Sequence, residues 1–192
     1  KASPVFFDMD GDGFKENTAW IGPEDALLAI DIDHDNAITK SEEIVFTKHA
    51  PDSKSDLEAI STAFDSNMNN KLDPGDTRWS DFKIWQDTNS DGVSSPTELK
   101  SLDEAGIEYI SLDFSNDTTA EKEEDVEIIR KTPIAWKSGK VGGLAYDLSL
   151  PYSTGGIKYN ENDHSLEINY ENGNTTKIYR HEGAAPIKVT LT

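Results

Sequence analysis

Residues 87–98 have the residue types and the spacing of a loop that binds calcium. They fit the pattern D-x-[DN]-x-[DN]-G-x5-E at every specified position. Calcium takes about 6–8 oxygen ligands, and such a loop supplies them from positions 1, 3, 5, 7, 9 and 12. Gly92 stands at the sixth position, where the chain must turn sharply and a Cβ would clash. The predicted ligands are Asp87, Asn89, Asp91, the carbonyl group of Val93, Ser95 and Glu98.

The end of this loop has a second interpretation as the start of a helix. Ser95 would be the N-cap, Pro96 the first helical residue, and Glu98 the acid of a capping box. The two interpretations are compatible, because the last ligand of such a loop normally lies in the first turn of the helix that follows it. We therefore expect a strand over 82–85, the loop, and a helix over 96–105.

Residues 31–42 form a second loop of the same kind. They depart from the pattern only in having Asn36 where glycine is expected. Asparagine is the other residue that tolerates a left-handed backbone, so the turn is still possible. The predicted ligands are Asp31, Asp33, Asp35, Ala37 through its carbonyl group, Thr39 and Glu42.

Two further stretches, residues 8–19 and 65–76, match less completely. In the first, Ala19 occupies the twelfth position, and Glu16 at the ninth could replace the missing acid; the alternative is a Gly/Asp turn between strands. In the second, Asn70 replaces glycine and Asp76 replaces the final glutamate. The predicted ligands are Asp8, Asp10, Asp12 and Glu16 in the first, and Asp65, Asn67, Asn69, Lys71 through its carbonyl group, Asp73 and Asp76 in the second.

Composition agrees with a protein that holds several cations. The chain has 192 residues and a formal net charge of −19, so its surface repels itself unless cations are bound. No basic stripe for nucleic acid and no apolar run long enough to insert in a membrane are visible. Without cysteine, disulfides and thiolate zinc sites are excluded. We expect an extracellular domain, part of a larger protein, that uses calcium in place of disulfides.

The elements that must position the loops are short. A strand is expected over 5–7, a helix over 23–30, and an amphipathic helix over 55–64 with Ser55 as its cap. Only ten residues separate the third loop from the fourth, which is too few for two helices and a turn. The fourth loop is therefore expected to be strand–loop–helix and not helix–loop–helix.

The second half of the chain is expected to be β-rich. A buried strand over 107–114 and a polar surface loop over 115–125 precede it. The Asn172-Gly173 pair predicts a hairpin over 165–180. The fold class is thus α+β in a single domain over 1–192, with EF-hand-like loops over 1–115 and an antiparallel β-rich region over 126–192. Further strands are expected over 126–131, 134–136, 144–150, 158–159 and 187–191.

The order of these landmarks over about residues 5–115 resembles a module of secreted RTX proteins. The resemblance rests on Phe7-Asp8 with its glycines, Trp20, the run from Asp25 to Asp31, Phe64-Asp65, and Lys83 to Gly92 followed by Glu98-Leu99. Two relatives share it. One is the peptide-binding domain of giant RTX adhesins, which captures peptide C-termini with the help of calcium. The other is the self-processing module of iron-regulated RTX proteins, which cuts an Asp-Pro bond when calcium binds.

The adhesin relative implies a calcium-dependent domain that binds a peptide or protein through a free carboxylate and is not an enzyme. Candidate ligand contacts are Trp136, Tyr146 and Asp147, which flank or lie in a Gly-rich segment. The alternative is that the two aromatic side chains belong to the core and that Asp147 is a surface acid. The self-processing alternative needs an Asp-Pro bond before the first strand, but Ser3 precedes Pro4 here. A third possibility is a calcium-stiffened spacer without a ligand.

Overall fold

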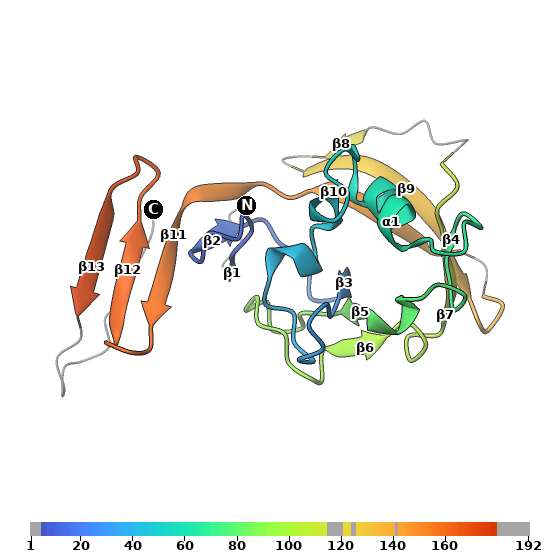
Figure 1. Ribbon diagram of the computed structural model, residues 1–192, viewed down its shortest axis with the longest axis horizontal. Coiled ribbons are helices and arrows are strands. Elements are labelled where there is room, and N and C mark those ends of the chain that lie inside the picture. Colours follow the sequence, from blue (N-terminus) through green and yellow to red (C-terminus); the bar gives the residue numbers. More distant parts are fainter. Residues whose placement is uncertain (1–4, 115–120, 124–125, 141, 180–192) are drawn as a thin grey trace.

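The computed structural model describes residues 5–114, 121–123, 126–140 and 142–179. These residues form three antiparallel sheets, and Figure 1 shows how they follow one another across the molecule. Strands predominate over helix, so the β-rich part of the expected fold class is confirmed and the helical part is smaller than expected. Among the described residues, no helix is both long enough and apolar enough to cross a membrane.

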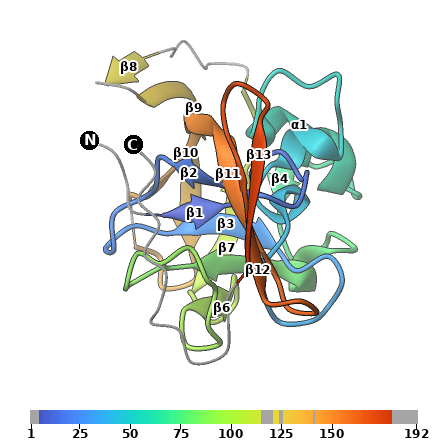
Figure 2. The same ribbon diagram turned by 90° about the vertical axis from the view of Figure 1, so that its left-hand side faces the viewer.

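The first sheet contains both ends of the described chain. Its order is β1-β2-β11-β12-β13, so the N-terminal hairpin is extended by the last three strands. Figure 1 shows β12 and β13 at one end of the molecule, and Figure 2 looks onto that end. The strands are β1 (Phe6–Phe7), β2 (Lys15–Thr18), β11 (Tyr152–Asn160), β12 (Ser165–Asn169) and β13 (Thr175–Tyr179).

The other two sheets contain the middle of the chain. One has the order β10-β9-β7-β4, with β8 also paired to β9, and the other has the order β3-β5-β6. Their strands are β3 (Leu27–Ile30), β4 (Lys71–Leu72), β5 (Phe82–Trp85), β6 (Leu99–Ser101), β7 (Ile107–Ser111), β8 (Glu121–Glu123), β9 (Val126–Trp136) and β10 (Leu144–Ser149).

One α-helix, α1 (Asp56–Phe64), lies against these sheets. It begins where the sequence predicts, because the Ser55 hydroxyl accepts a hydrogen bond from the Glu58 amide. Its apolar face, which includes Leu57, Ile60 and Phe64, joins the larger hydrophobic cluster. Among the described residues, three single-turn 3₁₀ helices complete the helical content: η1 (Ser41–Glu43), η2 (Phe46–Lys48) and η3 (Trp79–Asp81).

A second, smaller core lies between β1, β3 and β5. Phe7, Ala29, Ile38 and Trp85 are buried there. The Trp20 ring packs edge-on against Trp85, with 5.3 Å between the ring centroids. This core is the common support of the loops that follow β1, β3 and β5.

Two of the predicted helices are wrong, and in both cases strand pairing replaces the helix. Residues 27–30 form β3, whose backbone pairs with all four residues of β5. Residues 96–105 make one turn, closed by the hydrogen bond from the Glu98 amide to the Ser95 carbonyl at 2.9 Å, and then form β6. A helix over either segment would lose the ladder hydrogen bonds to β5, so tertiary pairing overrides local preference.

The β half follows the sequence more closely. The hairpin of β12 and β13 is confirmed around Asn172-Gly173. The two strands predicted over 126–136 are one strand, β9, and the described part of the predicted surface loop contains β8. The predicted strand over 187–191 lies outside the described residues.

Candidate metal centres

The four predicted loops share one backbone shape. In each of them the fourth and sixth residues have positive φ, between 55° and 88°. This conformation is unfavourable for residues with a Cβ, so its recurrence in four places reflects a common loop geometry. The sequence predicted it at the sixth position but not at the fourth. The residues are Gly11 and Gly13, His34 and Asn36, Met68 and Asn70, and Ser90 and Gly92.

The first aspartate of each loop holds the turn together. Its two carboxylate oxygens each accept one backbone N–H from the turn, over 2.7–3.2 Å. In the loop of residues 87–98, for example, the amides of Asp91 and Gly92 donate to Asp87. The same aspartate is the first predicted calcium ligand. The loop is therefore folded around this carboxylate.

The final acid closes the loop in a similar way. Glu98 accepts hydrogen bonds from the amides of Thr88 and Ser95, both at 3.1 Å. Asp76 accepts from the amides of Ser66 at 2.7 Å and Asp73 at 2.9 Å. In both loops the twelfth residue thus joins the second position to the ninth. The shorter aspartate makes the same connection as glutamate.

In the loop that starts at Asp31, this place is taken by Glu43. Its carboxylate accepts from the amides of Ile32 at 3.3 Å, Thr39 at 2.8 Å and Lys40 at 2.9 Å. Glu43 is fully buried, whereas the predicted ligand Glu42 is partly exposed. The structure therefore places the thirteenth residue where the pattern predicts the twelfth. The sequence offers two adjacent glutamates as the closing acid, and the twelve-residue pattern selects the first of them, Glu42.

Glu16 takes the corresponding role in the first loop, as the sequence suggested. It accepts the Met9 amide at 3.0 Å and is 2% exposed. Burial raises the pKa of Glu16 to about 7; the Met9 hydrogen bond opposes this, and the carboxylates of Asp10, Asp12 and Asp8 raise it further. A carboxyl group in this position gains from a cation beside it, because the cation removes the repulsion.

Two groups of three acids could each hold a metal ion. Their ligand atoms lie within 4.8 Å of one another in each group. Burial raises the pKa of Glu43 as well, and it outweighs the backbone hydrogen bonds from Lys40, Thr39 and Ile32, which lower this pKa. Both groups combine exposed and buried carboxylates, a donor set that suits a hard cation such as calcium. The groups are Asp8, Asp10 and Glu16, and Asp31, Asp33 and Glu43.

At some predicted ligand positions, the other two loops have asparagine where the first two have aspartate. Asn69 and Asn67 donate through Nδ2 to Asp73 at 2.8 and 3.3 Å, and Asn89 donates to Asp91 at 2.9 Å. Burial alone would raise the pKa of Asp73, but hydrogen bonds from Asn69, the Gly75 amide and Asn67 outweigh it and lower the pKa. Burial would also raise the pKa of Glu98, but hydrogen bonds from Ser95 and Thr88 outweigh it and lower this pKa. Both acids are thus held in the ionised form that a cation requires.

The three candidate contacts for an organic ligand have different surroundings in the described part of the chain. Asp147 is 5% exposed, and its Oδ2 accepts the Leu57 amide at the start of α1, at 2.9 Å. Trp136 donates from Nε1 to the Gly142 carbonyl at 2.9 Å. Tyr146 is 52% exposed on β10. Asp147 acts here as an anchor between β10 and α1.

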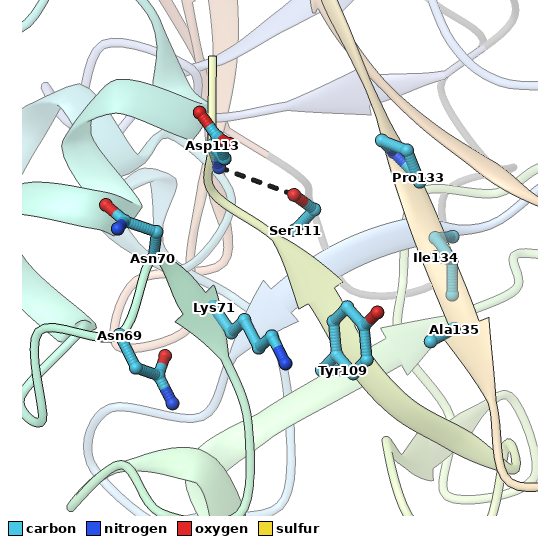
Figure 3. Close-up of a pocket in the computed structure, with 9 residues that line it drawn as sticks. All are labelled: Asn69, Asn70, Lys71, Tyr109, Ser111, Asp113, Pro133, Ile134 and Ala135. Atoms are coloured by element: carbon cyan, nitrogen blue, oxygen red, sulfur yellow. Dashed lines mark hydrogen bonds between the residues drawn. The ribbon is translucent and has the colours of Figure 1, made fainter. Parts of the chain in front are cut away.

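A pocket of about 360 Å³ lies elsewhere, over the outer side of β7 (Figure 3). One wall comes from the loop that starts at Asp65 and the other from β9. The Lys71 ammonium group lies 4.2 Å from the centre of the Tyr109 ring. The pocket is lined by Asn69, Asn70, Lys71, Tyr109, Ser111, Asp113, Pro133, Ile134 and Ala135.

Comparison with known proteins found a matching family model and a curated relative. A family model described as the SPM domain matches residues 1–150. Iron-regulated protein FrpA of Neisseria meningitidis serogroup C is 28% identical over 122 residues, covering 58% of this chain and 10% of that protein. The chain therefore spans about a tenth of the length of this curated relative. The family match ends just before β11, so the last three strands lie beyond it.

Proposed function

The chain belongs to the SPM-domain family, and we propose that it is a calcium-ordered module of the self-processing type from a secreted RTX-type protein, with Ser3 in place of the aspartate that cleavage requires. The resemblance described above implies that such a module cuts an Asp-Pro bond when calcium binds. The family model and the iron-regulated relative support this alternative over the adhesin domain. The calcium part of the proposal is supported by the four loops and by the two acidic groups.

One observation carries the proposal: a candidate calcium loop lies directly on the strand that follows Pro4. Val5 is fully buried, and its carbonyl accepts the Thr18 amide at 3.0 Å. A Cβ added at Gly92 would lie 2.6 Å from Val5 Cγ1 and 3.2 Å from the Phe6 carbonyl oxygen. Calcium in the loop of residues 87–98 would therefore fix the chain immediately after the bond between residues 3 and 4.

Cleavage at that place requires a nucleophile that this chain lacks. In the proposed step, the carboxylate of an aspartate attacks its own backbone carbonyl carbon. The C–N bond to proline breaks, the proline nitrogen takes a proton, and water then opens the cyclic anhydride. A serine stands before Pro4 here. We expect this chain to form the calcium-ordered module and to leave the Ser3–Pro4 bond intact.

The single Asp-Pro pair in the chain, Asp73-Pro74, is an unsuitable substitute. The Asp73 carboxylate accepts hydrogen bonds from the Gly75 amide at 2.8 Å and from Asn69 and Asn67. These bonds hold it inside its own loop and lower its pKa, which makes it a weaker nucleophile. Calcium ligation by the same carboxylate would weaken it further.

Replacing the missing nucleophile tests the proposal. We expect Ser3→Asp, with a folded tag fused before Lys1, to release a chain that begins at Pro4 when calcium is added. Ser3→Asn has a similar shape without the carboxylate, so it should stay intact, as should the unchanged protein. Gel electrophoresis and mass spectrometry of the fragments give the result. An intact Ser3→Asp chain that binds calcium by calorimetry would refute the self-processing proposal.

Binding of an acidic ligand is a second candidate, favoured by the pocket of Figure 3. In a protein of net charge −19, the Lys71 ammonium group on the Tyr109 ring offers a local positive charge to a peptide carboxylate. We expect Lys71→Met to weaken binding of free-acid peptides in calorimetry. Equal binding of free-acid and amidated peptides would contradict this candidate.

A further inference from the structure

Two of the candidate calcium loops touch each other at their eighth positions. Ile38 is the eighth residue of the loop that starts at Asp31, and Ser94 is the eighth of the loop that starts at Asp87. The Ser94 hydroxyl accepts the Ile38 amide at 2.7 Å and lies 3.3 Å from the Ile38 carbonyl oxygen, to which it donates. One side chain thus satisfies both backbone groups of Ile38.

The surroundings make this contact rigid. Ile38 is 1% exposed and packs in the smaller core with Phe7 and Trp85. Trp20, which packs on the same core, donates from Nε1 to Asp87 Oδ2 at 2.8 Å. The hydroxyl contact therefore lies over a close-packed core and not on a mobile surface.

The eighth residues of the other two loops have different partners. Lys15 is part of β2 and pairs with Ile157 of β11. Leu72 is part of β4 and pairs with Ile110 of β7. Each of these loops is thus joined to a strand of its own sheet, whereas the loops of Asp31 and Asp87 are joined to each other.

The contact lies between predicted ligands on both sides. Ile38 stands between Ala37 and Thr39, and Ser94 stands between Val93 and Ser95. An ion bound by the seventh and ninth residues of a loop fixes the two peptide groups between them, which contain the amide and the carbonyl group of the eighth residue. In the loop of Asp31 these are the groups that the Ser94 hydroxyl binds. Fixing one loop therefore lowers the entropy that remains for calcium to remove in the other, which is a source of positive cooperativity.

We propose that the loops of residues 31–43 and 87–98 bind calcium as a coupled pair, linked by the Ser94 hydroxyl, and that the loop of residues 65–76 responds independently. This inference rests on the proposed calcium-dependent function and concerns its regulation. A coupled pair makes the module respond to calcium over a narrower concentration range than separate sites would.

The Trp20 indole provides a reporter for one member of the pair. Because it donates to Asp87, its N–H resonance in a ¹⁵N-correlated NMR spectrum should shift when calcium enters residues 87–98. The peak is assigned by its loss in Trp20→Phe. Asp33→Asn weakens the partner loop, and Asp73→Asn removes the same charge from the independent loop.

In the unchanged background, we expect Asp33→Asn to raise the calcium concentration at the midpoint of the Trp20 shift by about fivefold or more, the lower range of allosteric couplings. Asp73→Asn should leave the midpoint unchanged. With Ser94→Ala, the effect of Asp33→Asn should fall below about twofold. Ser94→Thr keeps a hydroxyl group and should preserve it.

Several results would overturn the inference. These are an equal effect of Asp73→Asn, coupling that persists in Ser94→Ala, or a Trp20 midpoint that Asp33→Asn does not move. A Trp20 signal that does not respond to calcium would remove the calcium premise as well. None of these measurements involves cleavage, so a failed coupling with a cleaving Ser3→Asp chain would leave the proposed function standing.

Discussion

The loop-bearing region, residues 5–114, and the last three strands, β11–β13, are stabilised in different ways. The first contains two hydrophobic clusters and many carboxylates that accept hydrogen bonds from the backbone of their own loops. In the second, Ile168 is the one buried apolar side chain among those described, and Tyr152, Tyr159 and Tyr170 are exposed. The strands pair along their length instead, and β11 joins them to β2.

This difference indicates where calcium should matter. In the loops, backbone amides point at carboxylates that also repel one another, so a cation adds to the folding free energy. In β11–β13 the stabilising contacts are ladder hydrogen bonds and cross-strand side-chain pairs, which need no ion. Calcium should therefore control the stability of the first region and leave the hairpin of β12 and β13 almost unaffected.

The largest effect should come from the acid that closes the loop of Asp31. Glu43→Gln removes the charge that accepts three amides and that lies beside Asp31 and Asp33. With calcium bound, the cation offsets the burial that raises the pKa of Glu43, so losing this charge predicts a destabilisation of about 2 kcal/mol, together with weaker calcium binding. Thermal unfolding in saturating calcium measures the loss of stability, and calorimetric titration measures the loss of calcium affinity.

The adjacent Glu42→Gln is the matched control. Its side chain is partly exposed, so the change should alter stability by less than about 0.5 kcal/mol. If the two variants behaved alike, or if Glu42→Gln were the worse, the closing acid would be the twelfth residue after all.

A smaller effect is expected where β10 meets α1. Burial raises the pKa of Asp56 to about 6; the Thr47 amide opposes this, and Asp147 raises it further. The pKa of Asp56 in the folded protein thus exceeds the ordinary value of 3.8. Protonated Asp56 therefore contributes its full stability below pH 3.8, and this contribution is lost as the pH rises through about 6. Asp56→Asn should therefore stabilise the protein by about 1–2 kcal/mol at pH 7.5, with a gain that shrinks toward pH 5.

Melting curves in excess calcium across this pH range test the sign. The groups facing Asp56 include Asp147 from β10, whose own environment includes Ser55 and Arg130. Asp163, in the turn between β11 and β12, is a control for the direction of the pH effect. Ser165 and Lys177 lower its pKa to about 2, whereas burial raises the pKa of Asp56. A gain for Asp56→Asn that grew at low pH would contradict the assignment.

The smallest effect should come from the tip of the last hairpin. Gly173 has φ of 80°, which favours glycine, and a Cβ there would meet open space. Gly173→Ala should therefore cost about 1 kcal/mol through backbone strain alone. The loss should be the same with calcium and with chelator, as measured by hydrogen exchange in β12 and β13. A loss that appears only without calcium would break the distinction between the two regions.

Local patterns in the sequence predicted what local forces determine. The Ser55 cap located α1, Asn172-Gly173 located the hairpin, and alternating residues located β5, because each depends on neighbouring residues. The helices expected over 23–30 and 96–105 failed for the opposite reason. Their backbones pair with β5, which is distant in sequence, and no local signal reports that choice.

The candidate site shows the same limit. The first acid of every loop stands where the pattern places it, because the turn around it is local. Glu43 was missed because a fixed twelve-residue count cannot register one extra residue before the closing acid. The contact between Ile38 and Ser94 spans 56 residues, so it required the fold.

The position of β1 and β13 in one sheet has a mechanical consequence. A pulling force applied between these two strands would cross β2, β11 and β12, loading their ladder hydrogen bonds. The sheets that contain β3–β7, β9 and β10 would lie beside this line of tension. If the module is stretched within a longer chain, the turns around Asp31, Asp65 and Asp87 would remain unloaded until that ladder tears.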